Sequence, residues 1–100
     1  MENQHRKIAG YRELSQEEID LMNRIKAKGA ELLQLQSELI QMLIQQGRDK
    51  AADAAENTDR HAELERFQVA EPLHWADIGK TDIQTGIMAM VRAVAQPAGV

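Results

Sequence analysis

The stretch HRKIAGYRELSQEEIDLMNRIKAK, residues 5–28, decides the fold because it contains the most sharply defined helix start in the chain. The Ser15 hydroxyl is placed to accept a hydrogen bond from the Glu18 amide, while the Glu18 side chain reaches back to the Ser15 amide, which makes a capping box. Leu14 and Ile19 flank this box at the spacing of a hydrophobic staple, which fixes the angle at which the preceding arm enters. We therefore expect a helix to begin directly after Ser15.

Beyond this start, the sequence predicts one long amphipathic helix that continues to about Gln46 and ends at a cap formed by Gly47. Apolar and small residues recur along it at steps of three and four, as in the packed seam between two helices. The seam comprises Met22, Ile25, Gly29, Leu32, Gln36, Leu39 and Leu43. Further leucine, isoleucine and methionine residues widen the apolar stripe, so more than one face of this helix must be covered.

A second strongly apolar helix is expected over residues 73–95, with Pro72 at the first helical position, where proline is tolerated. Residues 48–69, between the two apolar helices, are rich in alanine and in charged side chains. This composition predicts a solvated helix or helical turn, with a break or a fresh cap at residues 57–59.

These patterns predict an all-α protein, a helical hairpin of long amphipathic helices that assembles into an interlocked homo-oligomer. We expect a single domain, with a basic N-terminal arm over residues 1–14 and the hairpin over residues 15–97. Two helices have little interior in which to bury such wide apolar faces, and monomers rarely expose patches of this kind. Gly79 and Gly86, seven residues apart on one face, further indicate close contact between helices.

The composition excludes several classes of protein. The chain has no cysteine, so neither a disulfide framework nor thiolate chemistry is available. No apolar run approaches the roughly 20 residues that span a bilayer, and the N-terminus lacks the apolar core of a signal peptide. We therefore expect a soluble intracellular chain that binds no membrane. Its net charge of −4 also argues against long nucleic acid as a partner, because such binding depends on neutralising phosphates.

Signatures of enzymes are scarce. The sequence has no Gly-rich phosphate loop, nucleophile motif or metal-spaced Cys/His cluster, so we expect no enzymatic activity, no cofactor and no metal site. The N-terminal arm is more suggestive, because Tyr11 lies there among basic residues at a fixed helix entry. An aromatic ring among cations suits the stacking of a base and the neutralisation of a phosphate. A packing role for Tyr11 within a solvated, charged helix start is the open alternative.

A resemblance extends this interpretation. Residues 5–35, HRKIAGYRELSQEEIDLMNRIKAKGAELLQL, resemble the N-terminal signature of a phage family, the anti-CBASS cyclic-nucleotide sponges of the second type. That family shares its helical hairpin domain with a Thoeris-blocking sponge family. Residues 75–97, WADIGKTDIQTGIMAMVRAVAQP, resemble the closing helix of the family, apart from Met90, where leucine is expected. The match covers both ends of the chain, and the middle is not diagnostic.

The resemblance implies binding without turnover. Family members form compact homohexamers and trap cyclic dinucleotides, such as 3′,3′-cGAMP, that switch on bacterial CBASS effectors, which implies action in the host bacterial cytoplasm. By resemblance, Tyr11 stacks on a purine base and Lys26 donates a charge-assisted hydrogen bond to a phosphate. The family also implies a separate site for cyclic trinucleotides, for which Lys28 and Arg66 are the candidate cations.

Other interpretations stay open at this point. Each of the candidate cations is also consistent with a solvated surface charge. A helical oligomer that binds another protein through its apolar seam would keep that partner after Tyr11→Ala and Lys26→Ala substitutions. A phosphodiesterase would instead release linear products and would require a metal that the sequence does not indicate.

Overall fold

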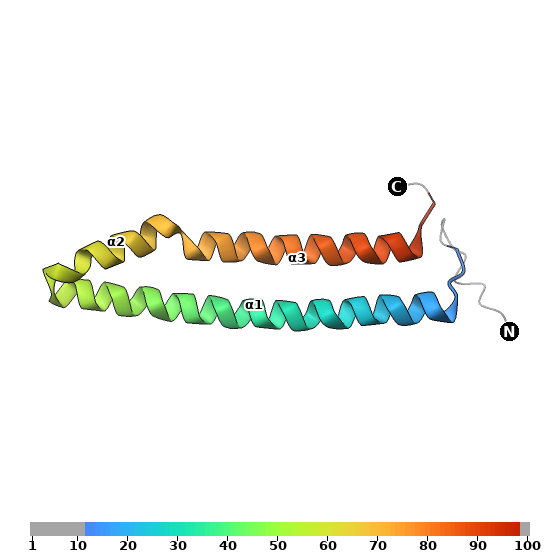
Figure 1. Cartoon of the computed structure of the whole chain (residues 1–100), viewed down its shortest axis with the longest axis horizontal. Helices are drawn as coiled ribbons and strands as arrows, with labels where there is room; N and C mark the ends of the chain where they lie inside the picture. Colours follow the sequence, from blue (N-terminus) through green and yellow to red (C-terminus); the bar gives the residue numbers. More distant parts are fainter. Residues whose placement is uncertain (1–11, 99–100) are drawn as a thin grey trace. The chain divides into compact units, whose positions relative to one another are not determined.

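The computed structural model describes residues 12–98, and within them every regular element is helical. Helix α1 spans Gln16–Glu56, the short 3₁₀ helix η2 spans Thr58–Arg60, α2 spans His61–Ala70 and α3 spans Pro72–Ala95. Figure 1 labels the three α-helices in chain order. The predicted all-α class is confirmed for this part of the chain.

The predicted capping box opens α1. The Glu18 amide donates to the Ser15 hydroxyl over 3.1 Å, and the Ser15 amide donates to Glu18 Oε1 over 2.9 Å. Leu14 and Ile19 are both half-buried at this end. Their closure as a hydrophobic staple stays a prediction, whereas the reciprocal cap is confirmed.

The prediction that α1 ends near Gln46 with a Gly47 cap is wrong. The helix continues to Glu56, because the alanine-rich residues 51–55 favour helix strongly. Gly47 lies inside α1 and faces α2, where a Cβ at this position would meet Phe67 Cε2 at 3.4 Å. The glycine therefore makes room for an aromatic ring instead of ending the helix.

The break after α1 lies where it was predicted, and the break after α2 has a local cause in the backbone. The Asn57 side chain accepts from the Asp59 amide over 2.9 Å, which confirms the expected fresh cap at residues 57–59. Glu71 adopts the left-handed conformation with φ 50° and ends α2. Pro72 then opens α3, in agreement with the prediction for this proline.

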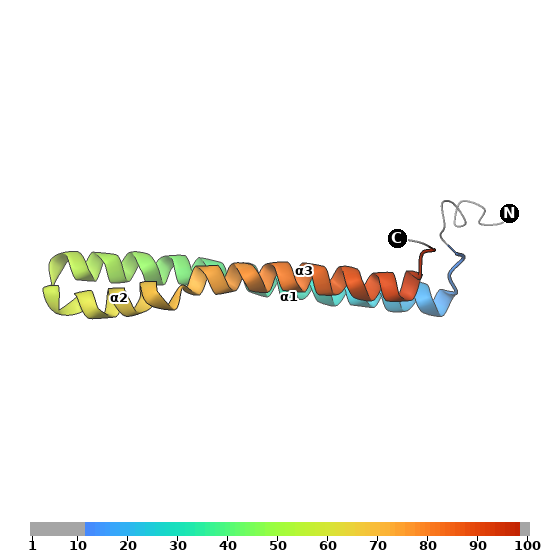
Figure 2. The same ribbon diagram turned by 90° about the horizontal axis from the view of Figure 1, so that it is seen from above.

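The chain divides into two compact units, each of which takes a section of α1 and a section of α3. Among the described residues, unit 1 contains residues 12–32 and 83–98, and unit 2 contains residues 33–82. Within unit 1, Figures 1 and 2 both show the start of α1 beside the end of α3. Within unit 2, Gln36 Nε2 donates to the Ala76 carbonyl oxygen over 3.0 Å. In each unit, the two helical segments therefore run antiparallel to each other.

The seam of α1 is partly as predicted. Met22, Ile25 and Gln36 are half-buried, and Gly29 and Leu43 are buried. Leu32 and Leu39 of this seam are exposed in the single chain, whereas their neighbours Leu33 and Ile40 are half-buried. The apolar stripe of α1 is therefore wider than the surface that the single chain covers.

A second apolar stripe is exposed along α1. Its members recur at three- and four-residue steps after Leu32, and Leu35 has 60% of its surface exposed. The exposed large apolar residues of α1 are Leu21, Leu32, Leu35, Leu39 and Met42.

The predicted close contacts at Gly79 and Gly86 are absent within the described chain, because a Cβ at either position meets nothing within 4 Å. The interlocked homo-oligomer stays a prediction. Within residues 12–98, no helix has both the length and the apolar character needed to cross a membrane.

Candidate functional site: a cationic groove in unit 1

A groove of about 370 Å³ in unit 1 carries the sequence-predicted residue Lys26, and we call it the Lys26 groove. Lys26 comes from α1, whereas the other lining residues come from α3 and the segment that follows it. Those residues are Ile87, Met88, Val91, Arg92, Ala95 and Pro97. Most of this lining is apolar, and its two cations come from two different helices. This is a surface on which a flat, partly apolar anion would find both a wall and a charge partner.

Arg92 is the residue of this groove that sequence reasoning missed. It belongs to the last turn of α3, where a cation complements the negative end of the helix dipole. This interaction with the dipole alone gives no reason to suspect a ligand role, but Arg92 also lines the same groove as Lys26. The signal in the sequence was the arginine of the VRAV run in the closing helix, but only the pairing of α3 with α1 connects it with Lys26.

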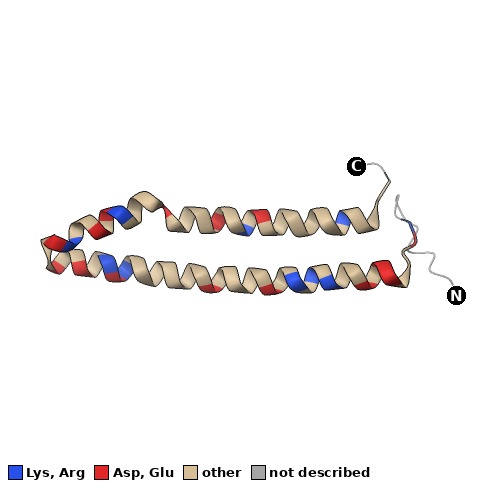
Figure 3. Ribbon diagram, in the orientation of Figure 1, with Lys and Arg blue, Asp and Glu red and all other residues tan. Residues whose placement is uncertain are grey.

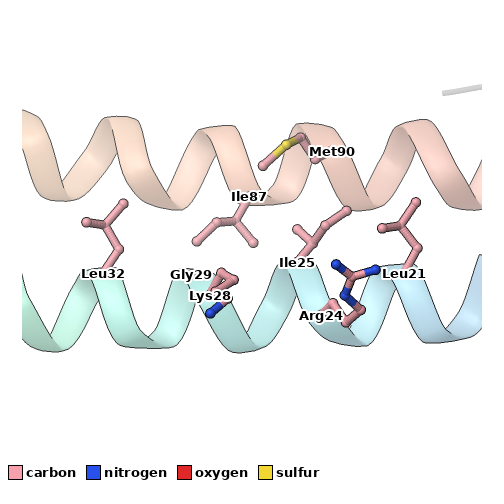
Figure 4. Close-up of a pocket in the computed structure, with 8 residues that line it drawn as sticks. All are labelled: Leu21, Arg24, Ile25, Lys28, Gly29, Leu32, Ile87 and Met90. Carbon is pink, nitrogen blue, oxygen red and sulfur yellow. The ribbon is translucent and has the colours of Figure 1, made fainter.

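A second groove of about 290 Å³ lies in unit 1 around Gly29, and we call it the Gly29 groove. Figure 4 shows Ile87 of α3 pointing toward Gly29, between residues of α1. Arg24 and Lys28 contribute the cations of this groove. The other lining residues are Leu21, Ile25, Leu32 and Met90.

Lys26 and Lys28 therefore line different grooves, and helix geometry explains why. At 3.6 residues per turn, side chains two positions apart project in nearly opposite directions. Lys28 is largely exposed, and its Nζ lies 3.9 Å from Glu31 Oε1, a weak solvated pair. Figure 3 shows basic residues gathered on the N-terminal part of α1, where residues 24–28 contribute three of them.

The N-terminal end of unit 1 is held by Arg12. Its guanidinium donates to Glu18 Oε2 over 2.5 Å and to the Val94 carbonyl oxygen over 2.8 Å. The hydrogen bond from Arg12 and the one from the Ser15 amide lower the pKa of Glu18 to about 2. The other predicted residue of this arm, Tyr11, lies outside the described residues.

Arg66 belongs to unit 2 and already has a carboxylate partner. Its Nη2 lies 2.7 Å from Glu63 Oε2, to which Lys50 Nζ also donates over 2.8 Å. These two hydrogen bonds, with that of Arg66 the stronger, lower the pKa of Glu63 to about 2, and the pairing raises the pKa of Arg66. Lys50 also lies over the Phe67 ring, 5.7 Å from its centroid. The described geometry explains Arg66 as part of an ion cluster at the α1–α2 corner.

Comparison with known proteins agrees with the helical architecture and with the resemblance seen in the sequence. Residues 4–95 match the family described as "Acb2/Tad1, hairpin domain", which covers nearly the whole chain. The chain is also 59% identical over 107 aligned positions to "Anti-CBASS protein 2" of Pseudomonas phage JBD67, covering 99% of each protein. The predicted family resemblance is thereby confirmed. The chain belongs to the Acb2/Tad1 hairpin-domain family.

Proposed function

We propose that this protein is a phage immune-evasion protein that sequesters cyclic dinucleotide second messengers in the host bacterial cytoplasm. Capture without cleavage would keep CBASS effectors inactive. The similarity to an anti-CBASS protein supports the immune-evasion part of this proposal. The proposal of a cyclic dinucleotide as the ligand rests on the Lys26 groove, in which two cations from different helices border an apolar wall.

Each part of a cyclic dinucleotide has a matching group in this proposal. Lys26 and Arg92 donate charge-assisted hydrogen bonds to phosphate oxygens. Tyr11 stacks on a purine base, and such stacking contributes about 1–3 kcal/mol per base. The apolar residues Met88 and Val91 offer apolar surface beside the charges. Because the ligand is nearly two-fold symmetric, two copies of the protein related by a two-fold axis would offer each half the same groups.

Sequestration places few chemical demands on the protein. It requires affinity in the nanomolar range, about −12 kcal/mol, and protein in at least stoichiometric amount. It requires no nucleophile, general base or metal, because no bond breaks. We therefore propose that the protein is not an enzyme and takes no cofactor.

Self-association is part of the proposal, with a homohexamer of interlocked chains as the expected form. The support is the exposed stripe of α1, in which Leu35 and Met42 are each at least half exposed. Such apolar stripes at three- and four-residue spacing suit helix-to-helix packing between copies. Stoichiometry is measured directly by light scattering coupled to size exclusion.

A site for cyclic trinucleotides is a second ligand proposal, with Lys28 and Arg66 as its candidate cations. Lys28 is the better supported of the two, because it lines the Gly29 groove beside Arg24. Arg66 would have to exchange its Glu63 partner for the ligand. Lys28→Ala and Arg66→Ala should weaken trinucleotide binding and spare dinucleotide binding, and unchanged trinucleotide affinity in both variants would reject these residues.

Isothermal titration with 3′,3′-cGAMP tests the central part of the proposal. We expect tight binding that Tyr11→Ala and Lys26→Ala each abolish or strongly weaken, while both variants keep the mass of the wild-type assembly. Absence of binding by the wild type, to dinucleotides and trinucleotides alike, would contradict the proposal. The remaining candidate would then be a helical oligomer that binds a protein through its apolar stripe.

A further inference from the structure

The C-terminal end of α3 is capped by a side chain from the opposite end of the chain. The last carbonyl groups of a helix have no amide partner further along the helix, and they form the negative end of its dipole. Val94 belongs to the last turn of α3, and its carbonyl oxygen accepts from Arg12 Nη2 over 2.8 Å. A cation that donates to such a carbonyl satisfies it and complements the dipole. The end of α3 is thus held by a residue 82 positions away.

Glu18 fixes the guanidinium that makes this cap. The same Nη2 of Arg12 donates to Glu18 Oε2 over 2.5 Å, while Glu18 Oε1 accepts from the Ser15 amide over 2.9 Å. Hydrogen bonds between ionised groups are shorter and stronger than those between neutral groups. The start of α1 and the end of α3 are therefore joined through one ion pair, which we call the Arg12–Glu18 clamp.

The clamped end of α3 forms part of the Lys26 groove. Of the seven residues that line this groove, Arg92 and Ala95 belong to the last turn of α3, and Pro97 follows it. Between them, Gln96 adopts the left-handed conformation with φ 48°, and its amide donates to the Arg92 carbonyl oxygen over 2.8 Å. The chain leaves the helix at this turn and still lines the groove at Pro97. This side of the groove therefore keeps its shape only while the end of α3 is formed.

We propose that Arg12 is a positioning residue, whose clamp with Glu18 holds the last turn of α3 and thereby keeps Arg92 and Pro97 in the wall of the Lys26 groove. This inference rests on the proposed function, because it gives that groove to the nucleotide. Helix ends fray when nothing holds them. A protein whose site is formed for only a fraction of the time binds with an affinity reduced by that fraction. Arg12 therefore supports binding without touching the ligand.

Two measurements on the full chain test this role. Amide hydrogen exchange at residues 93–96, followed by NMR without ligand, reports whether the end of α3 is formed. Isothermal titration with 3′,3′-cGAMP reports the groove. Arg12→Ala should accelerate exchange at residues 93–96 and leave the amides of unit 2 unchanged. Its affinity should fall about tenfold if the last turn is then formed about a tenth of the time. Arg12→Lys, which keeps the charge but not the planar group, should lie between the two proteins.

A rescue experiment separates positioning from direct contact. Glycine adopts a left-handed conformation more readily than other residues, so Gln96→Gly strengthens the end of α3 without adding charge. In the Arg12→Ala background it should slow exchange at residues 93–96 and recover part of the lost affinity. Glu71→Gly is the matched control, because Glu71 has φ 50° and ends α2 in unit 2. It should strengthen that helix end and recover no affinity.

Equal exchange at residues 93–96 in the wild type and in Arg12→Ala would overturn the inference, and so would equal affinities of the two proteins. Slow exchange restored by Gln96→Gly without any gain in affinity would also overturn it, because Arg12 would then act on the nucleotide itself. Failure of the proposed function looks different: the wild type binds no cyclic nucleotide, while exchange at the end of α3 still responds to Arg12→Ala. If circular dichroism shows that Arg12→Ala is unfolded, Glu18→Gln takes its place with the same predictions, because it weakens the clamp by removing one charge.

Discussion

Gly29 of α1 and Ile87 of α3 approach so closely that a side chain at position 29 would require Ile87 to move. A Cβ built there would lie 2.8 Å from Ile87 Cγ1 and closer still to its Cδ1, distances that real Cβ atoms do not adopt. Ile87 lines both the Lys26 groove and the Gly29 groove. The contact therefore fixes the spacing of the helices at the point where the candidate ligand site is built.

Substitution of Gly29 by alanine should destabilise the protein. Overpacking of a close helix contact costs about 1–3 kcal/mol, and the short approach of Ile87 places Gly29 in the upper part of this range, above the gain of about 1 kcal/mol that alanine brings to a helix interior. Gly86→Ala is the matched control in α3, because a Cβ at that position meets nothing within 4 Å in the chain. Urea unfolding should give a lower midpoint for Gly29→Ala than for Gly86→Ala, and equal midpoints would contradict the close contact.

Lys26→Ala and Arg92→Ala should each weaken the binding of 3′,3′-cGAMP. A hydrogen bond to a charged group contributes about 1.5–3 kcal/mol, so each loss should be roughly 10- to 100-fold in affinity. Lys80→Ala removes an exposed cation of α3 that lines neither groove and should bind like the wild type. An Arg92→Ala protein with wild-type affinity would remove this residue from the proposed site.

The stability of the protein should fall in acid, and Glu18 should account for part of this fall. Folding lowers the Glu18 pKa from its ordinary value of 4.5 to about 2, through the hydrogen bonds from Arg12 and the Ser15 amide. Because the pKa is lower in the folded state, the contribution is complete above the unfolded value and is lost as the pH falls from about 4.5 toward about 2.

Glu18→Gln should therefore reduce the difference between unfolding midpoints measured at about pH 7 and about pH 3. Glu63 has a pKa lowered to about 2 by Arg66 and Lys50, so it contributes in the same window and in the same direction. The double variant with Glu63→Gln should show the smallest acid sensitivity. An acid loss that is identical in the wild type and in the double variant would show that these carboxylates do not carry it.

Leu35→Lys should reduce the mass of the proposed assembly and leave the helix intact. The side chain is 60% exposed in the single chain, so a charge there disturbs little within the protomer but disfavours an apolar contact between copies. Gln34→Lys introduces the same charge at an exposed polar position of α1 and serves as control. Light scattering should report smaller particles for Leu35→Lys alone, and equal masses for the two variants would locate the interface elsewhere.

The sequence predicted those features of the fold that depend on local chemistry. The capping box of Ser15 and Glu18, the break at residues 57–59 and the start of α3 at Pro72 involve groups only a few residues apart. Such contacts form wherever the local sequence permits them, so they are visible without knowledge of the rest of the fold. Family resemblance supplied the candidate role of Lys26 in the same way, from a local motif.

Features that depend on distant residues escaped prediction. Gly47 resembled a helix cap because its actual neighbour, Phe67, lies in another helix. Periodicity alone does not separate Leu32, which is exposed, from Leu33, which is half-buried. The contact of Arg12 with Val94 joins positions 82 residues apart, and no local pattern indicates it.

Recovery of the ligand tests most directly whether the protein captures its nucleotide without changing it. A limiting amount of 3′,3′-cGAMP is mixed with excess protein, the mixture is passed through a membrane that retains the protein, and the retained fraction is then denatured. We predict a filtrate without nucleotide and complete recovery of intact cyclic 3′,3′-cGAMP after denaturation. Linear or mononucleotide products, or nucleotide that passes freely into the filtrate, would contradict sequestration.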